Sequence, residues 1–154
     1  DLESCELEFI SLGGSLSQAH LWQGRLALEP GRHRATMWPG EHSITGMPAF
    51  PELRTDGSFD AFLAVPDPAL ERAGLHGIVG KEWNLAEPVA GLGLMTGPDR
   101  PGTEWFTTFG IEHSMPWRPQ QVKAWAAVSS RLLQLETRAV QQRGDESRAP
   151  PPPW

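Results

Sequence analysis

Cysteine, tyrosine and basic residues are scarce in this chain, which has one Cys, no Tyr and 13 Lys and Arg against 19 Asp and Glu. A single thiol, Cys5, cannot form an internal disulfide and offers no paired-cysteine zinc site. The formal net charge of −6 disfavours binding to nucleic acid. Basic side chains gather only in a stretch that we interpret as a solvated strand edge, with Arg25, Arg32, His33 and Arg34.

Long apolar runs are also missing. No segment approaches the ~20 residues that a membrane-spanning helix needs, and no basic-then-apolar signal segment opens the chain. We therefore expect a cytoplasmic protein with no membrane partner, and the lone Cys5 permits a reducing compartment. Because the chain begins at Asp1 rather than at Met, we interpret it as processed or as cut from something longer.

Glycine and proline are plentiful, at 16 and 15 of the 154 residues. Such frequent chain breakers predict many turns and short elements, and they argue against an all-helical bundle. A hydrophobic share of 39% and a charged share of 21% are typical of a globular protein, and the length suits one domain. We predict a single domain over residues 1–143 and a proline-rich tail over residues 144–154. The seven Trp residues supply large apolar area, so several should anchor the core or a pocket.

The first twelve residues fit two structures. Apolar residues recur at helical spacing, acidic residues lie near the start as a helix prefers, and the glycine pair that follows would end a helix. The rival interpretation is a strand over residues 5–10, because Cys5, Leu7 and Phe9 alternate with polar residues. We favour the helix.

Strand patterns and turns fill the middle of the chain. A short helix is predicted over residues 68–73, because Asp67 can cap it, Pro68 suits its first position and Gly74 ends it. Residues 39–58 have little periodicity and predict a long loop. Apolar or alternating segments predict strands at 18–23, 31–38, 59–65, 89–95 and 105–113. We expect the first two strands to pair with each other and the last two to form an antiparallel hairpin.

A long amphipathic helix is predicted from Pro119 to Gln142, with an apolar seam that comprises Trp125, Val128, Leu132, Leu135 and Ala139. We favour a core role for this seam, in which Leu132 and Leu135 are buried while Arg131 and Arg138 are exposed. The alternative is that residues 132–140 pair with a second copy of the chain. Two heptads are too few to establish a coiled coil.

No catalytic or metal-binding motif stands out. The five histidines form neither an HxxxH nor an HExxH pair, so we interpret them as scattered surface or satisfied side chains: His20, His33, His42, His76 and His113. A GxSxG nucleophile turn is lacking, and no Lys-Ser or Lys-Thr pair follows the glycines of residues 74–80. We therefore predict no catalytic residue, no metal, no cofactor and no enzymatic activity.

The C-terminal segment resembles the end of a GAF domain. Over residues 105–140 (WFTTFGIEHSMPWRPQQVKAWAAVSSRLLQLETRAV), an apolar strand containing glycine leads into the turn Trp117-Arg118-Pro119. A helix with an Ala-rich middle follows and ends on the sequence LETRA at residues 135–139. The rest of the chain resembles the family only in the order of its elements.

The resemblance implies an α+β fold, in which an antiparallel sheet of five or six strands carries the N- and C-terminal helices on one face. It also implies a small-molecule pocket, or its vestige, under the loops between Pro39 and Trp83. Such domains are mostly sensory or dimerising modules of signalling proteins. The branch that reduces free methionine sulfoxide needs several cysteines, and bilin attachment uses a cysteine inside the domain, so Cys5 suits neither activity.

We hypothesise a non-enzymatic sensory or regulatory domain that binds a small molecule or forms a homodimer. The pocket would be lined by Trp38, His42, Phe62, His76 and Trp83, where aromatic rings form apolar walls and imidazoles orient the ligand. The interface would include Leu132, Leu135, Ala139 and Trp154. The alternative is a structural or adaptor subunit, in which the pocket is vestigial and the proline-rich tail docks on a protein partner. A third interpretation is an enzyme whose site leaves no sequence signature.

Overall fold

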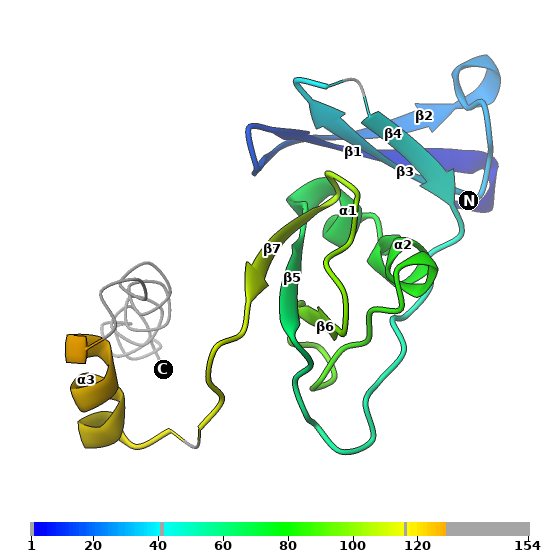
Figure 1. Ribbon diagram of the computed structural model, residues 1–154. Helices are drawn as coiled ribbons and strands as arrows, with labels where there is room; N and C mark the ends of the chain where they lie inside the picture. Colours follow the sequence, from blue (N-terminus) through cyan, green and yellow to red (C-terminus); the bar gives the residue numbers. More distant parts are fainter. Residues whose placement is uncertain (1, 41, 116, 129–154) are drawn as a thin grey trace, which may run out of the picture. The chain divides into compact units, whose positions relative to one another are not determined.

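The computed structural model describes residues 2–40, 42–115 and 117–128, and the chain forms two compact units, Asp1–Ser114 and Met115–Trp154 (Figure 1). Within the described ranges, the first unit contains seven strands in two sheets together with two α-helices. The α+β class predicted from the sequence is therefore confirmed. No helix of the described part is long and apolar enough to cross a membrane.

The first sheet has the strand order β2-β1-β3-β4. After a 3-10 turn, η1 (Leu2–Ser4), its strands are β1 (Cys5–Leu12), β2 (Ser15–Gln23), β3 (His33–Trp38) and β4 (His42–Gly46). β1 and β2 form an antiparallel hairpin, whose turn residues Gly13 and Gly14 have φ values of 57° and 78° that glycine adopts freely. β1 pairs with β3 in parallel, through a crossover that contains the 3-10 turn η2 (Gly24–Leu26), and β3 pairs with β4 antiparallel.

The N-terminal helix predicted from the sequence is wrong, and the rival strand is the observed structure. Side chains on both faces of β1 contact other parts of the unit, which favours the two-residue alternation of a strand over the spacing of a helix. Phe9 packs against the core, while Glu6 and Glu8 on the other face contact side chains of β2 and β3. The pairing predicted for the next two strands is also wrong, because β2 and β3 each pair with β1.

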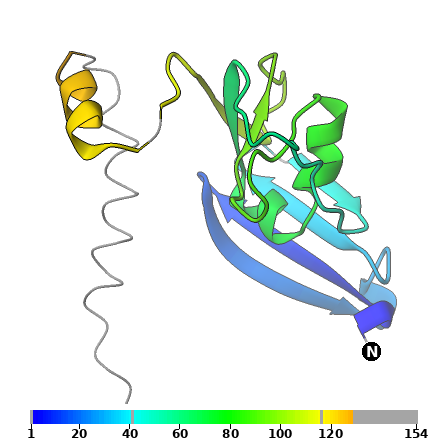
Figure 2. The same ribbon diagram turned by 90° about the horizontal axis from the view of Figure 1, so that it is seen from below.

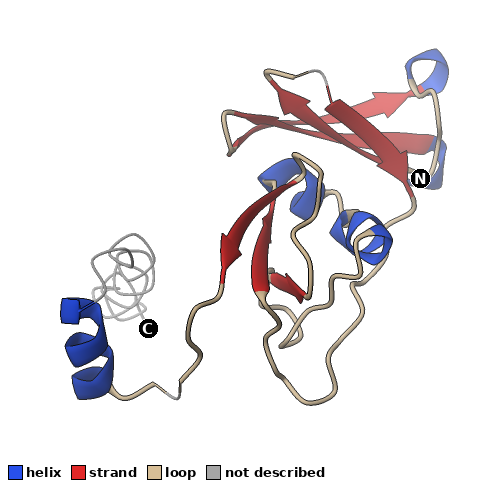
Figure 3. Ribbon diagram, in the orientation of Figure 1, coloured by secondary structure: helices blue, strands red, loops and turns tan. Residues whose placement is uncertain are grey.

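The second sheet has three antiparallel strands in the order β6-β5-β7, namely β5 (Phe62–Pro66), β6 (Met95–Gly97) and β7 (Phe106–Gly110) (Figure 3). The described residues therefore form sheets of four and three strands, where one sheet of five or six was expected. β6 and β7 flank β5 and do not form the predicted hairpin. The loop predicted over residues 39–58 contains β4, whose Ile44 and Thr45 favour a strand.

Two short helices follow β5: α1 (Pro68–Arg72) and α2 (His76–Glu82). The predicted cap is confirmed, because the Asp67 carboxylate accepts a hydrogen bond of 2.8 Å from the Ala69 amide. α1 packs against β1 and β3 of the first sheet, as Figures 1 and 2 show. The His33 ring, whose Nδ1 lies 2.8 Å from the Ala73 carbonyl oxygen, adds a polar contact between β3 and the end of α1.

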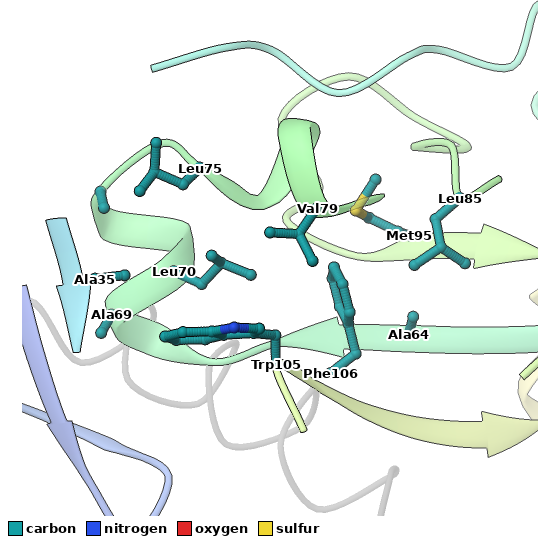
Figure 4. Close-up of a cluster of buried hydrophobic side chains, with 11 residues drawn as sticks. Ala35, Ala64, Ala69, Leu70, Leu75, Val79, Leu85, Met95, Trp105 and Phe106 are labelled. Carbon is teal, nitrogen blue, oxygen red and sulfur yellow. The ribbon is translucent and has the colours of Figure 1, made fainter. Parts of the chain in front are cut away.

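One apolar cluster joins these elements. Its buried side chains come from β3, β5, β6, β7, both helices and residues adjoining them, and Figure 4 shows those it labels, all but Ala73, gathered together: Ala35, Ala64, Ala69, Leu70, Ala73, Leu75, Val79, Leu85, Met95, Trp105 and Phe106. Met95 fits closely against α2, since a Cβ at Gly80 would lie 2.3 Å from its Cε atom. Of the tryptophans predicted as core anchors, Trp105 is in this cluster, whereas Trp38, Trp83 and Trp117 are exposed.

The second unit is described only in part. α3 (Pro119–Val128) begins at the predicted residue. The predicted continuation of the helix to residue 142 lies outside the described residues, and so does the boundary between residues 143 and 144. The interface residues Leu132, Leu135, Ala139 and Trp154 and the proline-rich tail lie there as well.

Replacing Leu70 with Ala tests the core. The Leu70 side chain is fully buried at 0% exposure, so the substitution should lower the free energy of unfolding by about 2–5 kcal/mol. The matched control is Leu28→Ala, at 73% exposure, which should change stability by less than about 0.5 kcal/mol. Denaturant melts measure both, and equal effects would contradict the assigned core.

Candidate functional site

The five residues predicted to line a pocket lie in different surroundings. Two of them contact the loop between β6 and β7: His42 Nε2 is 2.9 Å from Glu104 Oε2, and the Trp83 indole lies against Gly102. Trp38 ends β3 and is 45% exposed, and Phe62 lies in β5 between its paired residues on β6 and β7. Among the described residues, no hydrogen bond, ion pair or ring contact links any two of the five.

His76, the fifth residue, is half-buried at the start of α2. Its Nδ1 atom is buried and has no hydrogen-bond partner. Burial lowers the pKa of His76, and the nearby carboxylates of Glu71 and Glu87 oppose this shift only in part. The imidazole is therefore neutral around pH 7 and is surrounded by negative rather than positive charge.

The Glu87 carboxylate holds the loop that follows it. Glu87 is 5% exposed, and its two oxygens accept hydrogen bonds of 2.8 Å from the Gly93 amide and 3.2 Å from the Gly91 amide. Both glycines have positive φ, and a Cβ at Gly93 would come within 2.8 Å of Glu71 Oε1. Both Glu87 oxygens thus have backbone partners, whereas the buried Nδ1 of the nearby His76 has none.

A second polar cluster, missed by the sequence analysis, covers one face of the first sheet. Glu6 on β1 is fully buried, and its Oε2 accepts hydrogen bonds of 2.8 and 3.0 Å from the amides of Leu28 and Glu29 in the crossover. Its Oε1 lies 2.5 Å from Nη2 of Arg34 on β3, an ion pair that is not aligned as a hydrogen bond. Glu6 therefore ties β1 to the crossover and to β3.

Glu8, two residues along the same face, is equally engaged. It accepts hydrogen bonds of 2.8 Å from Trp22 Nε1 and 2.7 Å from Thr36 Oγ1, and His20 Nδ1 lies 3.8 Å from its Oε2. These contacts link β1 to β2 and β3. The alternation of Glu6 and Glu8 with Cys5, Leu7 and Phe9 was the available signal, and the helical interpretation concealed it.

In the described ranges, no group of three or more His, Cys, Asp or Glu side chains is placed to hold a metal ion. The buried carboxylates accept hydrogen bonds from amides, an indole and a hydroxyl, which offset the cost of burying them.

Three of the exposed apolar side chains lie in the segment of residues 47–53, which we call the Phe50 segment. Phe50 is 99% exposed, Met47 59% and Leu53 55%. The backbone of this segment lies directly on α2, because a Cβ at Gly77 would be 2.5 Å from the Ala49 carbonyl oxygen. These side chains are therefore displayed from a supported backbone.

Comparisons with known proteins add no family to this description. The chain matches no protein-family model, no curated protein and no solved structure.

Replacing Glu6 with Gln tests whether this acid holds the first sheet. The variant leaves Arg34 without its partner in a largely buried position and should lower the free energy of unfolding by about 3 kcal/mol. Glu82→Gln, at an exposed position of α2, is the matched control and should be nearly neutral. Chemical denaturation of both variants makes the measurement, and a neutral Glu6→Gln would show that the ion pair is dispensable.

His76 predicts a pH effect with a defined sign. Because burial holds the folded-state pKa of His76 below its ordinary value of 6.5, the unfolded chain binds the proton more readily. Its contribution to stability is therefore complete above the unfolded pKa and is lost as pH falls through the folded pKa.

The stability difference between the wild type and His76→Gln should accordingly shrink as pH is lowered from about 7 to about 5. Urea melts at several pH values measure this difference. A difference that is constant, or that grows toward acid pH, would refute the assigned environment of His76.

Proposed function

We propose that the chain is a non-enzymatic regulatory module that binds a protein partner through the Phe50 segment. The observation that carries this proposal is the 99% exposure of Phe50 on a backbone that is fixed at both ends. An aromatic side chain held in water forgoes the stabilisation of burial, and exposed apolar clusters of this kind mark interaction sites.

The backbone contacts of the Phe50 segment begin at its first proline. Pro48 lies against Gly74, where a Cβ would be 3.1 Å from the Pro48 Cβ, and the Ala49 amide donates a hydrogen bond of 2.9 Å to the Gly74 carbonyl. At the other end, the Glu87 amide donates to the Glu52 carbonyl at 2.7 Å, and the Arg54 amide donates to the Glu87 carbonyl at 2.9 Å. A partner would therefore meet a preordered segment and would lose little conformational entropy in binding it.

The Phe50 segment also has the chemistry of an interface centre. Aromatic and Met side chains are enriched in interface cores, and charged residues are depleted there. Met47, Phe50 and Leu53 supply such apolar groups, and Glu52 between them forms an ion pair of 3.8 Å with Lys81 of α2. The segment thus presents an apolar centre with a paired charge at its side.

The engagement of the buried acids supports a binding role over a catalytic one. Glu6, Glu8 and Glu87 all accept hydrogen bonds that hold strands or loops in place. A general acid or base needs a proton-accepting atom that can reach a substrate, and these oxygens have protein donors instead. The resemblance of the C-terminal segment to GAF domains favours a signalling protein as the setting of such a module, and an adaptor subunit of an assembly would use the same surface.

A second candidate function is small-molecule binding at His76. The buried Nδ1 lacks a hydrogen-bond partner, and a polar ligand group could supply one. A ligand that raises the melting temperature of the wild type and leaves His76→Gln unaffected would support it. The Phe50 segment is the better-supported site because several contacts fix it.

Photo-cross-linking tests the protein-binding proposal. A photoreactive phenylalanine analogue at position 50, introduced in the native cells, should yield one discrete adduct whose second component can be identified by mass spectrometry. The substitutions Met47→Ser and Leu53→Ser should reduce the adduct by about tenfold or more without changing the fold, because they remove apolar area beside the anchor.

The control places the same analogue at position 82, an exposed residue of α2 outside the segment. Equal cross-linking at both positions, or an adduct that is insensitive to the Met47 and Leu53 substitutions, would exclude the Phe50 segment as the docking site.

A further inference from the structure

β2 is an edge strand whose residues 18–23 lack the usual protection. It forms the outer edge of the first sheet, is nine residues long and, among the described residues, pairs with β1 alone. Its sequence, SLSQAHLWQ, contains no Asp, Glu, Lys, Arg, Pro or Gly. Soluble proteins normally guard such an edge with charges, prolines, short strands or a covering segment, because its free amides and carbonyls pair readily with another strand.

The other edge strands of the first unit are shorter. β4 and β7 each have five residues, and the first residue of β4, His42, contacts Glu104 of the β6–β7 loop. The bulge in the β1–β2 pairing lies between Ile10 and Ser11, near the hairpin turn, so residues 18–23 of β2 keep a regular register. The crossover after β2 bonds to β1 through Glu6 and the Cys5 carbonyl, and these bonds leave the outer edge of β2 open.

Side chains on one face of β2 are already held in place. The Trp22 indole donates to Glu8 at 2.8 Å, and the His20 ring meets the Trp22 ring edge-on, with centroids 5.3 Å apart. On the opposite face, Leu21 is 48% exposed. Residues 18–23 of the strand therefore offer a regularly paired backbone whose outer edge can accept a further strand.

We propose that β2 pairs antiparallel with β2 of a second copy of this chain, which joins two first sheets into one continuous sheet of eight strands, four from each copy. Charge argues for this occupant. Each copy has a net charge of −6, so contacts between acidic surfaces of two copies are disfavoured by repulsion, whereas β2 presents no acidic side chain.

Two-fold symmetry strengthens the argument. A two-fold axis perpendicular to the sheet sets each β2 residue opposite a residue of the same face, so every register opposes uncharged side chains. Nine residues give an edge of about 30 Å, long enough for a ladder of backbone hydrogen bonds. This interface is separate from the Phe50 segment and goes beyond the function proposed above.

Light scattering of the full chain after size exclusion tests the proposal. The wild type should have twice the mass of one chain across a dilution series. The double variant Gln18→Glu and Leu21→Glu places like charges on both faces of β2 and should weaken the dimer by about tenfold or more. The matched control Thr107→Glu and Gly110→Glu adds the same charge to exposed positions of β7 and should remain dimeric.

A monomeric wild type would overturn the proposal. A dimer that survives the β2 variant but dissociates when Leu132 and Leu135 are changed to Asp would also overturn it, and would assign the interface to the C-terminal segment. If the β2 variant does not fold, as judged by circular dichroism, hydrogen exchange of the wild type decides instead. The outward amides of β2 should then exchange more slowly as protein concentration rises, and exchange independent of concentration would refute the pairing.

Discussion

The first sheet depends on the contacts of one buried group, the Glu6 carboxylate. β1 and β3 are parallel neighbours, so the chain that leaves β2 must cross the N-terminal end of β1 before it enters β3. Glu6 accepts the Leu28 and Glu29 amides of that crossover and pairs with Arg34 of β3. One buried acid thus satisfies polar groups of the crossover and neutralises the one cation beside it, and the face that carries Phe9 and Ala35 is left to pack on α1.

Parts of this unit bury acidic side chains and expose apolar ones, the reverse of the usual arrangement. Glu6, Glu8 and Glu87 are buried and hold neighbouring backbone and side chains by hydrogen bonds, whereas Phe50 and several leucines are exposed to water. Buried acids are retained where they organise backbone that no regular ladder satisfies. The exposed apolar groups have no comparable role within the unit, and this contrast is the reason for assigning function to its surface.

Local signals in the sequence predicted some elements correctly. The Asp67-Pro68 start of α1 was predictable because capping depends on two adjacent residues alone, and the start of α3 at Pro119 follows the same logic.

The N-terminal strand was not predictable, because its residues fit both the helical and the strand spacing. The choice depends on Trp22, Arg34 and Thr36, which are distant in sequence. The split into two sheets likewise depends on long-range pairing. Of the predicted site residues, His76 has an unusual environment, but the acids around it and the support of Phe50 by Gly77 are tertiary features with no short motif.

The contact between Gly77 and the Ala49–Pro51 backbone has a consequence for the history of this surface. Any side chain at position 77 would push the segment away from α2, because the nearest backbone atoms lie only 2.5 to 2.7 Å from where a Cβ would be. If Phe50 binds a partner as proposed, selection that preserves the display of position 50 must also preserve the buried glycine at position 77. Among descendants of this sequence, loss of Gly77 and loss of the aromatic residue at position 50 should occur together, so a hidden helix position would record whether the outer surface is still in use.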